Sequence, residues 1–133
     1  MNTIYHFIFV CMLSLLGSSE VAAQRLAVPE YVTCDRNQLT SWQGEITRVN
    51  RKGNSVDLAI ETDYGTSESM TMAGASWEEV IAQFRLAGRP FTADDWSQLF
   101  DTEGNHRRGL RAIIWLCQAD DQPPIVNWQL PGR

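Results

Sequence analysis

Residues 42–62 have the sequence WQGEITRVNRKGNSVDLAIET, which is typical of two antiparallel strands joined by a turn. In the second strand, three apolar side chains alternate with polar ones and share one face: Val56, Leu58 and Ile60. The first strand places Trp42, Gly44 and Ile46 on one face, and its alternation fails at Val49. That failure predicts a bulge or a sharp bend, and residues 50–54 form the turn.

Three further segments have the composition of strands. Residues 68–73 follow a turn at 63–66 and place Met70 and Met72 inward. Residues 110–117 are apolar on both faces, which is typical of a central strand that is covered on each side. Residues 125–130 alternate and lie between Pro124 and Pro131, which favours an edge strand.

Between the third and fourth strands, the apolar period changes to that of a helix. Ser76 and Glu79 have the spacing of a capping box, and the helix that follows ends at Gly88. One apolar stripe runs along this helix and consists of four residues: Trp77, Val80, Ile81 and Phe84. Thr92 and Asp95 form a second box. The short helix after it buries three residues: Trp96, Leu99 and Phe100.

The order of these elements predicts a mainly β domain of the α+β class. Five strands with helices between the third and the fourth is the order of an OB-type barrel, in which the first strand meets the fourth. We therefore expect a five-stranded antiparallel OB-like barrel or a strongly curved sheet, with two short helices between strands three and four. An open antiparallel sheet with the helices on one face is the alternative. The resemblance to OB barrels is architectural, covers residues 42–130, and involves no family-specific motif.

The N-terminus has the features of a signal peptide. Residues 4–16 form an apolar run of 13 residues, which is shorter than the roughly 20 that a transmembrane helix needs. Small residues at 21–23 suit signal peptidase, which places cleavage of segment 1–23 after Ala23 and leaves a single domain, 24–133. We expect a periplasmic or secreted protein with no stable membrane insertion after cleavage. An uncleaved anchor or a buried N-terminal helix is the alternative.

Cleavage removes Cys11 and leaves two cysteines, Cys34 and Cys117. In an oxidising compartment, two cysteines most simply form one disulfide. Cys34 precedes the first strand and Cys117 ends the fourth, so antiparallel pairing of these strands would bring the two together. A metal pair or a reactive thiol is less favoured, because there is no Cys-x-x-Cys spacing and His106 is the one remaining histidine. We expect no cofactor.

The charge balance argues against nucleic acid as a partner. The chain has 16 acidic and 11 basic residues and a formal net charge of -5, so it has no general attraction for phosphate backbones or anionic lipid. The expected outer face of strands two and three also lacks aromatic and basic side chains. Six residues make up this face: Asp57, Ala59, Glu61, Glu68, Ser69 and Thr71.

Two groups of side chains are candidates for binding. The first is the one dense basic cluster, suited to a phosphate, a carboxylate or an acidic partner. It consists of four residues: His106, Arg107, Arg108 and Arg111. The second is Trp42 with Trp128, near the ends of expected edge strands, because Trp is enriched at binding hot spots; segment 122–128 is then the recognition element. Alternatively, the arginines pair with Asp101 and Glu103, and the last strand seals the barrel.

From these features we predict a small exported binding module of a bacterial envelope, without catalytic activity, that contacts a protein or an envelope glycan. An inhibitor or assembly partner of another secreted protein is the first alternative. The second is a carboxylate-dependent hydrolase that uses Asp94, Asp95, Asp120 or Asp121, although these acids have the positions of helix-cap and turn residues. Nucleophiles, bases and metal ligands are few, so we assign no catalytic or metal-binding residue.

Overall fold

The computed structural model of the protein describes residues 26–119 and 121–132. The expected signal peptide, with its cleavage site after Ala23, therefore lies outside the described residues. Among the helices of the described part, none combines the length and the apolar character that crossing a bilayer would require.

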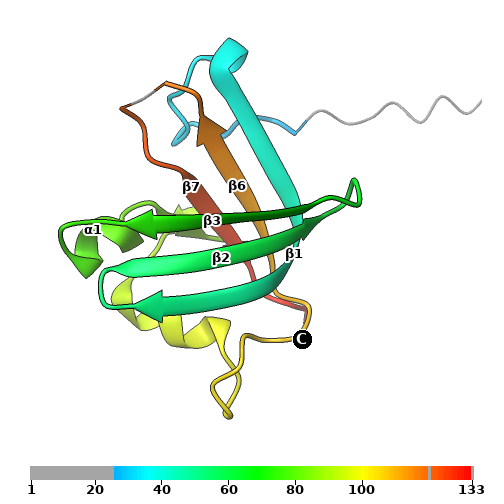
Figure 1. The fold of residues 1–133 in the computed structure, drawn as a ribbon, viewed down its shortest axis with the longest axis vertical. Helices are drawn as coiled ribbons and strands as arrows, with labels where there is room; N and C mark the ends of the chain where they lie inside the picture. Colours follow the sequence, from blue (N-terminus) through cyan, green and yellow to red (C-terminus); the bar gives the residue numbers. More distant parts are fainter. Residues whose placement is uncertain (1–25, 120, 133) are drawn as a thin grey trace, which may run out of the picture.

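The described chain forms one mixed sheet with three short helical segments (Figure 1). Its elements are, in chain order, η1 (Arg36–Gln38), β1 (Leu39–Lys52), β2 (Ser55–Thr62), β3 (Ser67–Ala73), α1 (Trp77–Ile81), β4 (Phe84–Leu86), β5 (Arg89–Pro90), η2 (Ala93–Leu99), β6 (Arg111–Cys117) and β7 (Ile125–Gln129). The seven strands lie in the order β3-β2-β1-β6-β7-β4-β5. All five expected strands are present, and the expected mainly β class is confirmed.

The expected five-stranded antiparallel barrel is wrong in strand number, strand direction and closure. The sheet has seven strands, β4 runs parallel to β7, and the order β3 to β5 is open at both ends. The reason is physical: β4 pairs with the edge of β7 through Phe84↔Val126 and Leu86↔Trp128. In a closed OB-like barrel, that edge would have been available to β3.

The long strand β1 belongs to both halves of the sheet. Its first half, Leu39–Glu45, pairs with β6, and its second half, Gly44–Lys52, pairs with β2. Between Ile46 and Arg48 the register with β2 shifts, which confirms the predicted irregularity in this strand. As Figure 1 shows, the strand curves there, so that β2 and β3 cross over β6 and β7 at a large angle.

Gly44 makes this double pairing possible. It lies opposite Thr62 of β2 and also opposite Ala112 of β6. A Cβ atom at this position would overlap the carbonyl oxygen of Glu61 and lie 2.7 Å from the Cα atom of Thr62. Only glycine therefore allows the backbone of β2 to approach so closely.

The first predicted helix is shorter than its apolar stripe suggested. One half of the capping box is present: the Ser76 hydroxyl accepts from the Glu79 N–H at 3.2 Å, whereas the Glu79 carboxylate accepts from the Ala75 N–H rather than from that of Ser76. The helix α1 ends at Ile81. Phe84 lies in β4 instead, and Gly88 (φ 82°) lies in the turn to β5 rather than at a helix end. Pairing of β4 with β7 has overridden the local helical period here. The second helix begins after Thr92 as predicted, as the 3-10 segment η2.

The main core lies between the two halves of the sheet. The helices α1 and η2 add Val80, Ile81 and Leu99 to it. Phe84 is fully buried at its centre, and four aromatic rings surround it at centroid distances of 5.3–6.4 Å: Trp77, Phe91, Trp96 and Trp128. Most of these pairs are edge-to-face, which is the favoured geometry for aromatic rings. The expected inward positions of Trp77 and Trp96 are thus confirmed, since both pack against this core.

The last strand is not the edge strand that its flanking prolines predicted. β7 lies between β6 and β4 and pairs with both. The side chains of Val126 and Trp128 are fully buried in the main core. Segment 122–128 is therefore wrong as a recognition element exposed along an edge, and the strand completes the interior of the sheet instead.

Candidate functional site

A segment of irregular chain, residues 26–35, covers the outer face of β6. We call it the lead-in. It forms a second, smaller core with the two residues of β6 that point away from the main core, Ile113 and Trp115. From the lead-in, Val32 and Cys34 are buried against them. This explains why residues 110–117 are apolar on both faces, and it confirms the predicted covered central strand.

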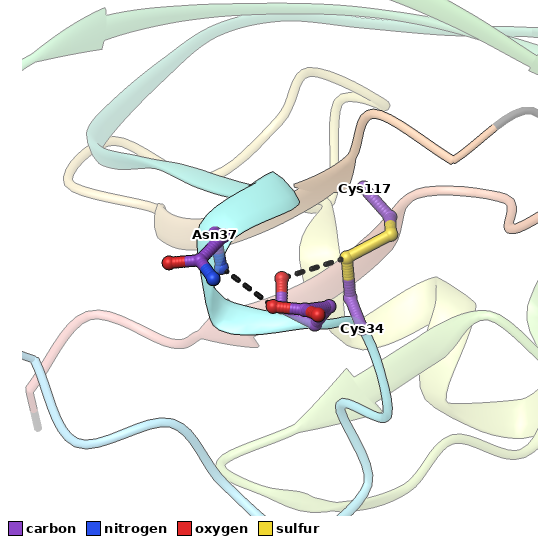
Figure 2. Close-up of a disulfide and its surroundings, with 4 residues drawn as sticks. Cys34, Asn37 and Cys117 are labelled. Atoms are coloured by element: carbon purple, nitrogen blue, oxygen red, sulfur yellow. Dashed lines mark hydrogen bonds between the residues drawn. A yellow bond between two sulfur atoms is a disulfide. The ribbon is translucent and has the colours of Figure 1, made fainter.

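A disulfide holds the lead-in at one end (Figure 2). Cys34 is bonded to Cys117, as predicted, and their Cα atoms are 5.8 Å apart. Because Cys117 pairs with Leu39 in the β1–β6 ladder, the bond lies where β1 begins and β6 ends. Figure 2 also shows the next turn of chain, in which the Asp35 carboxylate accepts from the Asn37 N–H at 2.8 Å and caps η1.

Tyr31 anchors the lead-in to β4. The guanidinium carbon of Arg85 lies 4.9 Å from the centre of the Tyr31 ring, which is a cation–π distance. Burial raises the pKa of the Tyr31 phenol, and the positive charge of Arg85 offsets part of that rise. The phenol therefore stays protonated at neutral pH.

The candidate site is the groove between the lead-in, the start of β1 and the β2–β3 turn, with a volume of about 600 Å³. We call it the lead-in groove. Its apolar lining comes from Leu26, Val28, Leu39 and Trp115, and its polar lining comes from five residues: Arg36, Thr40, Ser41, Gln43 and Asp63. Tyr64 stands at its rim with 91% of its surface exposed. A cavity of this size, with apolar walls and a few polar groups, is typical of ligand sites.

The β2–β3 turn is held against β1 and β6 by polar contacts. The Asp63 N–H donates to the Gln43 carbonyl at 2.9 Å. One terminal nitrogen of Arg111 donates to both carboxylate oxygens of Asp63, at 2.6 and 2.9 Å. These bonds fix the position of Tyr64, the next residue, at the rim of the lead-in groove.

A smaller hollow of about 410 Å³ lies on the other side of the lead-in. It shares Leu26, Ala27 and Trp115 with the lead-in groove. Asn127 lines this hollow, but its side-chain oxygen already accepts from the Gly88 N–H at 2.9 Å. The lead-in therefore separates two depressions, of which the larger one carries more polar groups without such an internal partner.

None of the predicted binding residues lines the lead-in groove. Trp128 is fully buried, so its prediction as a partly exposed contact residue is wrong; the reason is the pairing of β7 with β4. Trp42 is half-buried and packs against the main core. In the basic cluster, Arg111 lies in β6 and pairs with Asp63, whereas residues 106–108 lie in the loop after η2.

The alternative partners of that loop are not formed either. The Asp101 carboxylate accepts from the N–H groups of Glu103 and Asn105, at 2.9 and 3.0 Å, and so stabilises its own turn. Within the described part of the chain there are two ion pairs, Arg89–Asp95 and Arg111–Asp63, and neither joins Asp101 or Glu103 to an arginine of 106–108.

The described acids among those proposed for hydrolysis, Asp94, Asp95 and Asp121, line neither the lead-in groove nor the smaller hollow. Asp95 is a buried residue in the first turn of η2, and its carboxylate accepts from Arg89, Thr92 and Gln98. The hydrogen bonds from Arg89 hold the pKa of Asp95 well below its ordinary value of 3.8. Asp94 is exposed, and Asp120 lies outside the described residues. Among the residues that are described, no group of three or more His, Cys, Asp or Glu side chains is placed to hold a metal ion.

Sequence reasoning missed the residues of the lead-in groove. They come from the lead-in, η1, β1, the β2–β3 turn and β6, and no local motif joins them. The one available signal was strand 110–117, which is apolar on both faces. Its outer face therefore had to be buried by a segment other than the strands beside it. Comparisons of the chain with protein-family models, curated proteins and solved structures find no match.

Proposed function

We propose that this protein is a small exported binding module without catalytic activity, and that it holds an envelope glycan in the lead-in groove. The observation that carries the proposal is the groove itself, in which aromatic side chains and uncommitted polar side chains line one cavity. Thr40, Ser41 and Gln43 each offer both donors and acceptors, as the hydroxyl groups of a sugar require. Tyr64, with 91% of its surface exposed, supplies apolar ring surface for the C–H face of a sugar.

Export is part of the proposal. The disulfide between Cys34 and Cys117 supports an oxidising compartment, because cytosolic thiols are kept reduced. A signal peptide at 1–23 with cleavage after Ala23 would deliver the chain to the periplasm or the exterior.

A protein ligand is the second candidate, and the described surface favours it less. Protein interfaces are centred on well-packed apolar or aromatic anchors. On the described residues, only two large hydrophobic side chains are exposed, Leu26 at 38% and Tyr64 at 91%. An inhibitor or assembly partner would need a wider apolar patch than these two residues provide.

Binding to purified cell-wall glycan tests the proposal. The disulfide-bonded protein is incubated with insoluble peptidoglycan, and the bound fraction is measured against protein concentration. We expect Tyr64→Ala and Gln43→Ala to weaken binding at least tenfold, and Lys52→Ala, an exposed residue at the far end of β1, to leave it unchanged. Equal binding by all four proteins, or no binding by the wild type, would contradict the proposal.

A further inference from the structure

The two edges of the sheet differ in how they are protected. The edge strand β5 is two residues long and contains Arg89 and Pro90, and a charge and a proline are both common protections of an edge. The other edge strand, β3, is seven residues long and contains neither proline nor a basic residue. Its register with β2 is continuous, so no bulge turns it away from a further strand.

The hydrogen bonds of β3 show which of its backbone groups are free. The Thr62 N–H donates to the Thr66 carbonyl at one end, and the Gly74 N–H donates to the Asn54 carbonyl at the other. In an antiparallel ladder these bonds alternate, so residues 68, 70 and 72 face β2 with their N–H and C=O groups. The backbone groups of Ser67, Ser69, Thr71 and Ala73 therefore point outward, where no described strand pairs with them.

A groove runs beside the second half of this edge. It has a volume of about 380 Å³ and lies between Thr71–Gly74 on one side and α1 with Pro123 and Pro124 on the other. It lies where β3 would pair with β7 in a closed OB-like barrel. In this structure, β4 pairs with that edge of β7 instead. The two prolines have no N–H, so their side of the groove cannot supply a regular strand partner. A strand that enters this groove therefore pairs with β3.

The charges beside the edge are acidic. Glu68 lies opposite Ile60 and so shares the inner face of the sheet with Met70 and Met72, which corrects its expected place on the outer face. Glu79 lines the groove. On the outer face, Asp57 lies next to Thr71 and accepts from its hydroxyl at 2.6 Å. No basic residue occurs in β3 or lines this groove.

We propose that the free edge of β3 binds an extended segment of another polypeptide, rich in Lys or Arg, as an added strand. Main-chain hydrogen bonds to Ser67, Ser69 and Thr71 provide the pairing, as in other cases of strand addition. The acidic side chains select basic residues on the incoming strand. A second copy of this chain is a poorer occupant, because it would bring the same acids to the same edge. This site is separate from the lead-in groove and does not rest on its function.

The test uses randomised decapeptides displayed on phage, selected on the purified, disulfide-bonded protein. The strongest peptide is then synthesised and its Kd is measured. We expect Lys or Arg at alternate positions of this peptide, affinity that falls with salt, and slower hydrogen exchange at the amides of Ser67, Ser69 and Thr71 on binding.

Two variants of Ser69 distinguish the contribution of its backbone N–H to peptide binding from that of its side chain. Ser69→Pro removes an outward N–H but none of the bonds to β2, so we expect at least a tenfold higher Kd. Ser69→Ala keeps the N–H, so we expect a Kd within twofold of the wild type. The amide NMR signals of Val56 and Leu58 check that Ser69→Pro has kept the β2–β3 pairing. The hydrogen-exchange experiment uses the wild type and so does not depend on whether a variant folds.

Three results would overturn the proposal. The first is a selection that enriches no peptide or enriches acidic ones. The second is a peptide whose binding leaves the exchange of the three amides unchanged or is unaffected by Ser69→Pro. The third is a dimer of the free protein, seen by sedimentation, that protects the same amides, which would assign the edge to a second copy.

Discussion

Arg89 donates from both terminal nitrogens to the carboxylate of Asp95, at 2.8 and 2.9 Å. The same carboxylate accepts from the Thr92 N–H and the Gln98 amide, so one buried side chain joins β5 to the start of η2. We expect Asp95→Asn to lower the free energy of unfolding by about 1–2 kcal/mol, because charged hydrogen bonds are lost while the exposed Arg89 is partly screened by water. Urea denaturation measures this loss. Asp94→Asn, an exposed neighbour, is the control and should change stability little.

The same pair predicts a pH dependence. The pKa of Asp95 is lower in the folded protein than its ordinary value of 3.8, so the folded state favours the ionised form. Its contribution is complete at neutral pH, declines as the pH falls below about 4, and is lost below the folded pKa. The stability difference between the wild type and Asp95→Asn should therefore shrink in acid. A difference that grows as the pH falls would contradict this prediction.

The disulfide should contribute strongly to stability. It joins residues 83 positions apart. For a loop of that length, the chain-entropy model gives a stabilisation of up to about 4.5 kcal/mol. We expect the double variant Cys34→Ser, Cys117→Ser to lose most of that amount in denaturant unfolding. Hydrogen exchange should quicken first at Val32, because the lead-in loses its covalent attachment. The reduced and alkylated wild type provides an independent comparison, and equal stability of all three forms would refute the prediction.

Gly44 should tolerate no side chain. The added Cβ of Gly44→Ala meets the backbone of Glu61 and Thr62, which cannot move without breaking the β1–β2 ladder. We expect a loss of about 3 kcal/mol or more, or no folded protein. Gly132→Ala serves as the matched control, because nothing lies within 4 Å of the added atom. Thermal unfolding followed by circular dichroism distinguishes the two, and similar melting temperatures would show that β2 has room to shift.

Phe84 should be the most sensitive position of the aromatic core. It is fully buried and contacts four other rings. Truncation to alanine leaves a large cavity, so we expect Phe84→Ala to lower the free energy of unfolding by about 3–5 kcal/mol. Tyr64→Ala removes an aromatic ring of similar size from an exposed position and should cost little stability. If both variants lose the same amount, the ring of Phe84 does not organise the core.

The sequence predicted those parts of the fold that depend on local pattern. The strands at β1, β2, β3, β6 and β7 follow from alternation and turn residues, and the irregularity of β1 follows from its broken period. The pairing of Cys34 with Cys117 follows from their places at the ends of neighbouring strands. Each of these features is determined by residues close together in the chain or by antiparallel pairing of predicted strands.

The rest depended on distant contacts. Phe84 fits a helical stripe as well as a strand, and only the parallel partner β7 decides between them. That same pairing moves Trp128 from an edge to the interior. The lead-in groove joins five segments that are separated by up to 89 positions, from Leu26 to Trp115, so its members share no motif. Periodicity showed that β6 needed a cover but could not identify residues 26–35 as the cover.

The place of the lead-in has a consequence for the order in which the molecule matures. The lead-in leaves the ribosome before any strand, yet the surface on which it rests, Ile113 and Trp115, comes nearly at the end of the chain. A nascent chain shorter than 117 residues lacks Cys117, the disulfide partner of Cys34, and part of the surface that buries Val32. The lead-in groove, which Trp115 lines, therefore takes shape only after synthesis is almost finished.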